Sequence, residues 1–267
     1  MKQPELGIKI SELRKQKGLT QEELVHRCNI NVRTLQRIES GEVTPRSYTI
    51  KTILSALDHD YESLYENNPS KIKPISASEA KSSFSLLTIT WVAGILFLVA
   101  AVFEGIVDWY RFYDGELIFG RSWYMAIKIM VLVFNCVLLF GFLITGKLLN
   151  NYLMKIAAVL MAFALFCFCT YDIISLFRGG ITFEVIILAE AITFGALGIL
   201  FGISIIKSSA QLGRIAYVSG GMELLTAFCL LTVFLAPLAL FLFFPTIILE
   251  VLVLVKMATM VKEQLRQ

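Results

Sequence analysis

Arginine and glutamine side chains gather on a short segment near the start of the chain, where their chemistry suits the edges of DNA bases. Val32, Arg33, Gln36 and Arg37 fall within about two turns of a helix. An arginine can donate two hydrogen bonds to guanine, a glutamine can pair with adenine, and a valine can contact the methyl group of thymine. The same residue types also occur on ordinary solvated helix faces, so their spacing alone leaves both interpretations open.

A second set of polar residues lies within strongly apolar parts of the chain. These residues are Asn135, Glu190, Glu223 and Glu250. Ionisable groups are costly in an apolar environment, and a group of them could bind a cation, relay protons or hold a cationic ligand. Distances along the helices place the three glutamates at different depths, so we do not expect them to share one level. The favoured alternative is hydrogen-bonded or protonated glutamates facing the interior of a bundle.

No enzyme signature is present, and we expect neither a catalytic site nor a cofactor. The chain contains no P-loop, no HExxH motif and no GxSxG motif. Its two histidines, His26 and His59, are not expected to be ligands. The five cysteines do not form paired CxxC motifs, so neither a metal site nor a disulfide framework is predicted.

The elements that must position the first set of residues are short helices. Thr20 and Glu23 form a capping box, Asn31 is a good N-cap, and Gly41 can end the helix that carries Arg33. Apolar residues recur at helical spacing through this region. The expected helices are residues 5–16, 20–27, 32–40, 48–57 and 61–65. Residues 1–65 are therefore predicted to form a five-helix domain.

Composition divides the chain into a part suited to water and a part suited to lipid. The hydrophobic fraction is 57% and the mean hydropathy is +0.71, well above the values of soluble domains. Residues 1–83 contain 13 basic and 11 acidic residues, whereas the much longer remainder, 84–267, contains 11 and 10. Residues 66–83 are rich in Pro, Ser, Lys and Asn and are predicted to be a flexible linker.

The apolar part is long enough for about six membrane-spanning helices, which makes the whole chain all-α. An apolar helix of about 20 residues crosses the hydrocarbon core. The expected spans are residues 84–103, 123–145, 152–174, 184–206, 214–235 and 238–258. The last two come from one long run that we divide at Ala236-Pro237; five spans with a kinked last segment is the alternative. Gly198 and Gly202 form a GxxxG motif, which could pack within one chain or between two.

The distribution of charge predicts which ends of the spans face the cytoplasm. The basic residues expected inside are Lys147, Lys155, Lys207, Arg214, Lys256, Lys262 and Arg266. Those expected outside are Arg111, Arg121 and Arg178, in loops that also carry Glu104, Asp108, Asp114 and Glu116. The positive-inside rule then puts both termini in the cytoplasm. The N-terminus has no signal-peptide pattern. We therefore expect a multi-pass protein of the inner (cytoplasmic) membrane.

The segment from Gly18 to Pro45, GLTQEELVHRCNINVRTLQRIESGEVTP, resembles the Cro/C1-type (XRE) helix-turn-helix family. The residues that carry the resemblance are Gly18, Thr20, Gln21, Glu22, Glu23, Leu24, Thr34, Leu35, Ile38, Glu39, Gly41 and Pro45. The resemblance covers about a quarter of the chain and implies a lambda-repressor-like fold for residues 1–65. In this family, the N-terminal residues of the second helix of the motif face DNA bases.

The resemblance also implies roles for individual residues. Val32, Arg33, Gln36 and Arg37 would contact bases. Gln21, Asn31 and Arg46 would contact phosphates, and Arg14 and Glu39 would form a buried structural salt bridge.

Together, these features predict a membrane-anchored, sequence-specific DNA-binding transcriptional regulator whose bundle is a tether and a candidate sensor. The expected partners are double-stranded DNA, the lipid bilayer, a second copy of the chain as a homodimer, and an unidentified ligand of the bundle. Two alternatives stay open. One is a membrane adaptor whose helix-turn-helix domain docks a cytosolic protein. The other is a small transporter or channel with a regulatory N-terminal domain.

Overall fold

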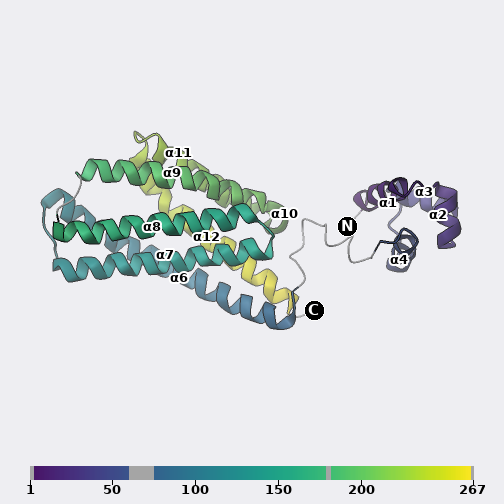
Figure 1. The fold of residues 1–267 in the computed structure, drawn as a ribbon, viewed down its shortest axis with the longest axis horizontal. Coiled ribbons are helices and arrows are strands. Elements are labelled where there is room, and N and C mark those ends of the chain that lie inside the picture. Colours follow the sequence, from purple (N-terminus) through teal and green to yellow (C-terminus); the bar gives the residue numbers. More distant parts are fainter. Residues whose placement is uncertain (1–2, 60–74, 179–181, 266–267) are drawn as a thin grey trace. The chain divides into compact units, whose positions relative to one another are not determined.

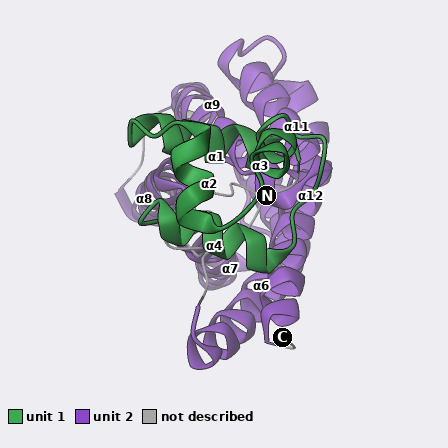
Figure 2. Ribbon diagram, turned by 90° about the vertical axis from the view of Figure 1, so that its right-hand side faces the viewer, with its two compact units in different colours: residues 1–71 green, residues 72–267 purple. Residues whose placement is uncertain are grey.

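A computed structural model describes residues 3–59, 75–178 and 182–265. The chain divides into two compact units, Met1–Lys71 and Ile72–Gln267, which Figure 2 distinguishes by colour. The part of the chain that the structure describes is helical and contains no strand, which confirms the all-α prediction. Each unit has its own hydrophobic core, and each is described separately below.

The N-terminal unit contains four described helices, labelled in Figure 1. They are α1 (Glu5–Gln16), α2 (Gln21–Cys28), α3 (Val32–Glu39) and α4 (Ser47–Ala56). These bounds agree with the first four predicted helices to within a residue or two. The fifth predicted helix, at residues 61–65, lies outside the described residues, as does Arg266 near the end of the chain.

Local sequence explains where these helices begin and end. The Thr20 side chain accepts a hydrogen bond from the backbone N–H of Glu23, whose carboxylate accepts one from the backbone N–H of Thr20. Asn29 adopts a left-handed conformation with φ of 50° and ends α2. The Asn31 side chain then accepts from the backbone N–H of Arg33 at 2.9 Å and caps α3. The residue that ends α2, Asn29, and the residue that caps α3, Asn31, therefore also form the turn between these helices.

The second unit is a bundle of long apolar helices. Its elements are α6 (Ala77–Trp109), the π-helix η1 (Tyr110–Asp114), α7 (Gly120–Leu148), α8 (Tyr152–Arg178), α9 (Phe183–Lys207), α10 (Ser209–Leu212), α11 (Arg214–Leu231) and α12 (Ala236–Gln264). Among the described residues, six helices are long and apolar enough to cross a membrane, α6 together with η1 and then α7, α8, α9, α11 and α12. The structure therefore confirms six candidate spans rather than five. Pro237 lies in the first turn of α12, where its missing N–H costs nothing.

Two predicted boundaries are wrong. Residues 77–83, predicted as part of the linker, form the first turns of α6, because Ser76 and Glu79 make a capping box and Ala80 is buried in the bundle core. Glu104 and Asp108, predicted in an outer loop, lie within α6. Charged side chains marked the end of the apolar run in the sequence, but in the structure these two face a buried lysine on α7.

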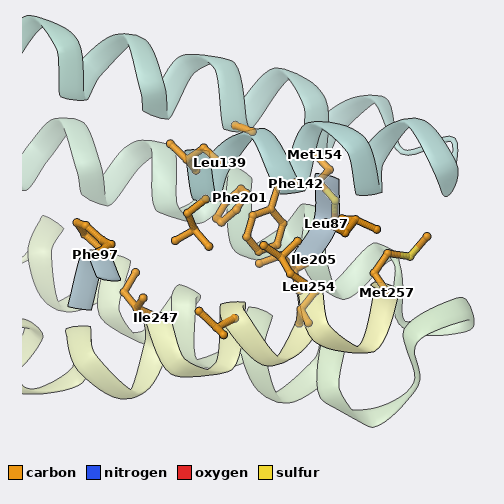
Figure 3. Close-up of a cluster of buried hydrophobic side chains, with 14 of the residues drawn as sticks. Leu87, Phe97, Leu139, Phe142, Met154, Phe201, Ile205, Ile247, Leu254 and Met257 are labelled. Atoms are coloured by element: carbon orange, nitrogen blue, oxygen red, sulfur yellow. The ribbon is translucent and has the colours of Figure 1, made fainter. Parts of the chain in front are cut away.

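The bundle core contains large apolar side chains from five of the long helices, several of which are labelled in Figure 3. Phe142 of α7 and Phe201 of α9 meet edge to face at 4.8 Å between ring centroids. The buried side chains labelled in the figure are Leu87, Phe97, Leu139, Phe142, Met154, Phe201, Ile205, Ile247, Leu254 and Met257.

The GxxxG motif packs within the chain, against α11. A Cβ atom added to Gly202 would lie 2.9 Å from the carbonyl oxygen of Gly220, and one added to Gly198 would lie 3.0 Å from the Cβ atom of Ala227. Small residues on both helices thus allow the backbones of α9 and α11 to approach closely.

This close approach can be tested with a matched pair of variants. We expect Gly202→Ala to destabilise the bundle by about 1–3 kcal/mol, because the new methyl group meets the backbone of α11. Gly221→Ala is the control, because a Cβ atom there meets open space. Thermal unfolding of the full chain in nanodiscs measures both. Equal midpoints for the two variants would contradict the proposed packing.

Candidate functional site

Helix α3 has one buried face and one exposed polar face. Leu35 and Ile38 are fully buried in the core of the N-terminal unit, whereas Arg33, Gln36 and Arg37 are exposed. The polar side chains that the sequence singles out on this helix are therefore accessible to a partner. Val32, the fourth residue predicted to touch bases, is half-buried and packs partly against the core.

A chain of hydrogen bonds connects the interior of the unit to the exposed face of α3. The Glu39 carboxylate accepts hydrogen bonds from Nε and Nη2 of Arg14, at 2.8 and 3.0 Å. The Gln21 side-chain amide donates to the same carboxylate at 2.7 Å. Gln36 in turn donates to Oε1 of Gln21 at 3.3 Å. Helices α1, α2 and α3 are thus joined through one buried carboxylate, and Gln36 is oriented by the last bond of the chain.

Burial and hydrogen bonding have opposite effects on the ionisation of Glu39. Burial disfavours the charged carboxylate, but the hydrogen bonds from Arg14 and Gln21 outweigh it and lower the pKa of Glu39 below its usual value. The side chains of Arg14 and Glu39 are only 10% and 7% exposed. This geometry is that of the structural pair expected from the family resemblance.

The remaining residues predicted to contact DNA lie around the ends of the helices. Asn31 caps α3 and Arg46 immediately precedes α4, and both are exposed. Arg37 is not isolated from acidic groups, because it forms an exposed ion pair with Glu42 at 3.5 Å. Tyr48, in the first turn of α4, is 81% exposed and was not among the predicted contacts. An aromatic residue two positions after Arg46 is the signal that could have found it.

Comparison with known families matches residues 10–62 to a model described as helix-turn-helix. The matched range spans α2 and α3, whose caps and buried faces have the geometry described above. The N-terminal unit contains a Cro/C1-type helix-turn-helix domain. A domain of this kind is typical of DNA-binding regulators. No curated protein and no solved structure matches the chain.

The Cro/C1-type domain occupies the N-terminal unit, and the other predicted polar site is in the bundle. The carboxyl groups of Glu223 of α11 and Glu250 of α12 are close enough to interact, and the exposed fractions of these residues are 8% and 4%. The two side chains thus interact, although their positions along the helices predict different depths. One carboxyl can donate to another only when it carries a proton. Glu190 and Asn135 are half-buried on α9 and α7 and do not belong to the pair.

A larger polar cluster lies where α6, α7 and α8 meet, and none of its members is among the predicted sites. The Lys128 ammonium lies 3.0 Å from Glu104, 2.8 Å from Asp108 and 2.7 Å from Asp172. Tyr124 donates a hydrogen bond to Asp108 at 2.7 Å. We call these five residues the Lys128 cluster. Lys128 inside the predicted span 123–145 and Asp172 inside the predicted span 152–174 were the signal that could have found it.

The role of Glu39 can be tested through its effect on stability as pH changes. A lowered pKa in the folded state means that ionised Glu39 stabilises the domain fully above about pH 5, and that this contribution is lost as pH falls through the folded pKa. We expect Glu39→Gln to destabilise the domain by about 2 kcal/mol at pH 7 and to flatten its loss of stability in acid.

Amide hydrogen exchange of peptides from α1 to α3, corrected for the intrinsic effect of pH, measures this in the full chain. Glu42→Gln is the matched control, because the Glu42 side chain is 62% exposed. If Glu39→Gln and Glu42→Gln behave alike, the buried carboxylate does not hold the three helices together.

Proposed function

We propose that this protein is a membrane-anchored, sequence-specific DNA-binding transcriptional regulator. The observation that supports the proposal best is the exposed face of α3. Arg33, Gln36 and Arg37 lie on the exposed side of a helix whose opposite side is buried. The hydrogen bonds from Arg14 and Gln21 to Glu39 fix the last turn of this helix. A pre-positioned helix of this kind can enter the major groove of DNA as a rigid unit.

The side chains on this face suit distinct features of DNA. Arg33 and Arg37 can bind guanine O6 and N7, and Gln36 can pair with adenine. The ion pair between Arg37 and Glu42 does not oppose this role strongly, because exposed pairs contribute little and rearrange easily. Val32 is half-buried and so offers only part of its surface to a thymine methyl group.

Three further residues are proposed to bind phosphates and so to fix the register of the domain on DNA. Gln21 uses one hydrogen of its side-chain amide to bind Glu39, which leaves the second hydrogen for a phosphate oxygen. Asn31 lies at the N-terminus of α3, where backbone N–H groups and the helix dipole favour an anion. Arg46 is exposed just before α4.

The bundle is proposed to cross the inner membrane six times with both termini in the cytoplasm. An even number of spans returns the chain to the side on which it began. Basic residues are concentrated in the loops and tail at the end of the bundle where α6 begins, which is the end connected to the DNA-binding domain. This is the distribution that the positive-inside rule requires. In this arrangement, the bundle keeps the DNA-binding domain close to the bilayer.

We also propose that two copies act together on DNA and that the bundle influences how they do so. Helix-turn-helix proteins commonly bind two half-sites about one helical turn apart as dimers. Tethering two domains to neighbouring bundles would raise their effective concentration for adjacent half-sites. A change in the bundle could then alter occupancy of DNA without any change in α3.

DNA binding by the full chain in nanodiscs tests the proposal directly. A library of double-stranded DNA selects the preferred sequence, and fluorescence anisotropy then measures the affinity for it. Arg33→Ala and Arg37→Ala should each weaken specific binding about 10–100-fold, because each removes a contact to a base worth about 1–3 kcal/mol.

Arg27→Ala is the matched control. Arg27 is an exposed arginine that lies beside Lys51 and Thr52 of α4, away from the exposed face of α3, and its loss should leave sequence preference unchanged. The main rival is a membrane adaptor that docks a cytosolic protein. It gains support from the near balance of 10 basic and 9 acidic residues in residues 1–65. Absence of sequence preference in the parent protein at low salt would favour this rival and refute the proposal.

A further inference from the structure

The Lys128 cluster is a group of buried charges in which acidic groups outnumber basic ones. The side chains of Lys128 and Asp172 are each only 7% exposed, and three carboxylates surround the single ammonium. An ammonium group has three hydrogens to donate, so each carboxylate can receive one. The carboxylates come from two different helices, α6 and α8, and Lys128 on α7 therefore ties three helices together.

One further cation belongs to the surroundings of the cluster. Arg111 of η1 donates hydrogen bonds to the Asp172 carbonyl oxygen at 3.3 Å and to the Ser175 hydroxyl at 2.7 Å. Its guanidinium also lies over the ring of Tyr124, 4.7 Å from the centroid. If every group is ionised, three negative charges face two positive ones. The cluster then holds an uncompensated negative charge in a place where water cannot solvate it fully, which is costly.

The neighbouring helices do not supply the missing positive charge. Glu190 of α9 is close enough to Asp172 to interact electrostatically, and as an acidic residue it supplies no positive charge. Cys169 lies on α8 and directs its sulfur to the Lys128 carbonyl oxygen at 3.7 Å. The titratable or charged groups around Lys128 are therefore Glu104 and Asp108 of α6, Arg111 of η1, Tyr124 of α7, Cys169 and Asp172 of α8, and Glu190 of α9.

We propose that the Lys128 cluster is a proton-binding site through which the bundle responds to acidification of the compartment it faces. One proton on a carboxylate removes the excess charge and allows α6, α7 and α8 to pack more tightly. A proton suits the site better than a metal ion, because no group of three His, Cys, Asp or Glu side chains among the described residues is arranged to hold a metal.

The position of the cluster allows protons to reach it from solvent and connects it, through α6, to the DNA-binding domain. Glu104 and Asp108 are about a quarter exposed, unlike Lys128 and Asp172, so the cluster is open on their side. It lies at the end of the bundle where η1 joins α6 to α7. In the proposed topology, on which this inference rests, that end faces away from the cytoplasm. Helix α6 also follows the DNA-binding domain in the chain and is the shortest covalent route to it.

Tryptophan fluorescence of the full chain in nanodiscs tests the proposal. The three tryptophans, Trp91, Trp109 and Trp123, all lie in α6 and α7, so their signal reports the bundle and not the DNA-binding domain. We expect the thermal midpoint of the wild-type bundle to rise by about 2–4 °C between pH 8 and pH 5.5. Asp172→Asn removes one of the three negative charges around Lys128. It should raise the midpoint at pH 8 and remove most of the dependence on pH.

Glu116→Gln is the matched control, because Glu116 is an exposed carboxylate in the loop after η1. It should keep the wild-type dependence on pH. If Asp172→Asn does not fold, Glu104→Gln decides the question by the same criterion. The proposal is overturned if the wild-type midpoint does not change with pH, or if the variant in the cluster responds to pH as fully as the wild type does.

Two further experiments identify the ion and the side of the membrane from which it reaches the cluster. Replacing sodium chloride with choline chloride at fixed pH should leave the midpoint unchanged, and a dependence on sodium would overturn the assignment to protons. In liposomes, tryptophan emission should change when only the compartment opposite the DNA-binding domain is acidified. A full response from the other side would contradict the proposed direction. No arm uses DNA, so the outcome is independent of whether the protein binds DNA.

Discussion

The Glu39 carboxylate is the group on which the geometry of the N-terminal domain depends. It accepts hydrogen bonds from Arg14 of α1 and Gln21 of α2 while belonging to α3 itself. A carboxylate buried to this degree is tolerated only when its charge and its lone pairs are satisfied. The three helices must therefore keep one relative arrangement. That arrangement presents the polar face of α3, and Gln36 is the first exposed side chain that the network orients.

The same constraint, that charge removed from water must be paired, organises the bundle. Its helices are long and apolar, and most of their contacts are non-directional packing that several registers could satisfy. Lys128 and its three carboxylates are directional and admit few alternatives. The glycines of α9 add a steric requirement, because α11 can approach closely only where they lie. The register of the bundle thus depends on a small number of polar and small residues within an apolar majority.

Much of the fold could be predicted from the sequence, because its signals are local. Capping residues such as Thr20 and Asn31 mark the starts of the short helices, and runs of apolar residues mark the long ones. The exposed face of α3 was predictable for the same reason, since helical periodicity separates Leu35 and Ile38 from Arg33 and Arg37. Features that depend on tertiary contacts were harder to predict. The cluster around Lys128 brings together residues as far apart as Glu104 and Asp172, and nothing local indicates that they meet. The pairing of Glu223 with Glu250 was hard to predict for the same reason, because it joins side chains of two different helices.

In the proposed function, one unit contacts DNA and the other responds to the membrane or to the compartment on its far side. Genome-wide mapping of the intact protein on DNA in living cells tests this account most directly. The account predicts discrete sites that share a sequence motif and that disappear when Arg33 and Arg37 are both replaced by alanine, while the protein remains in the membrane fraction. Occupancy without a shared motif, or sites that persist in the double variant, would contradict it.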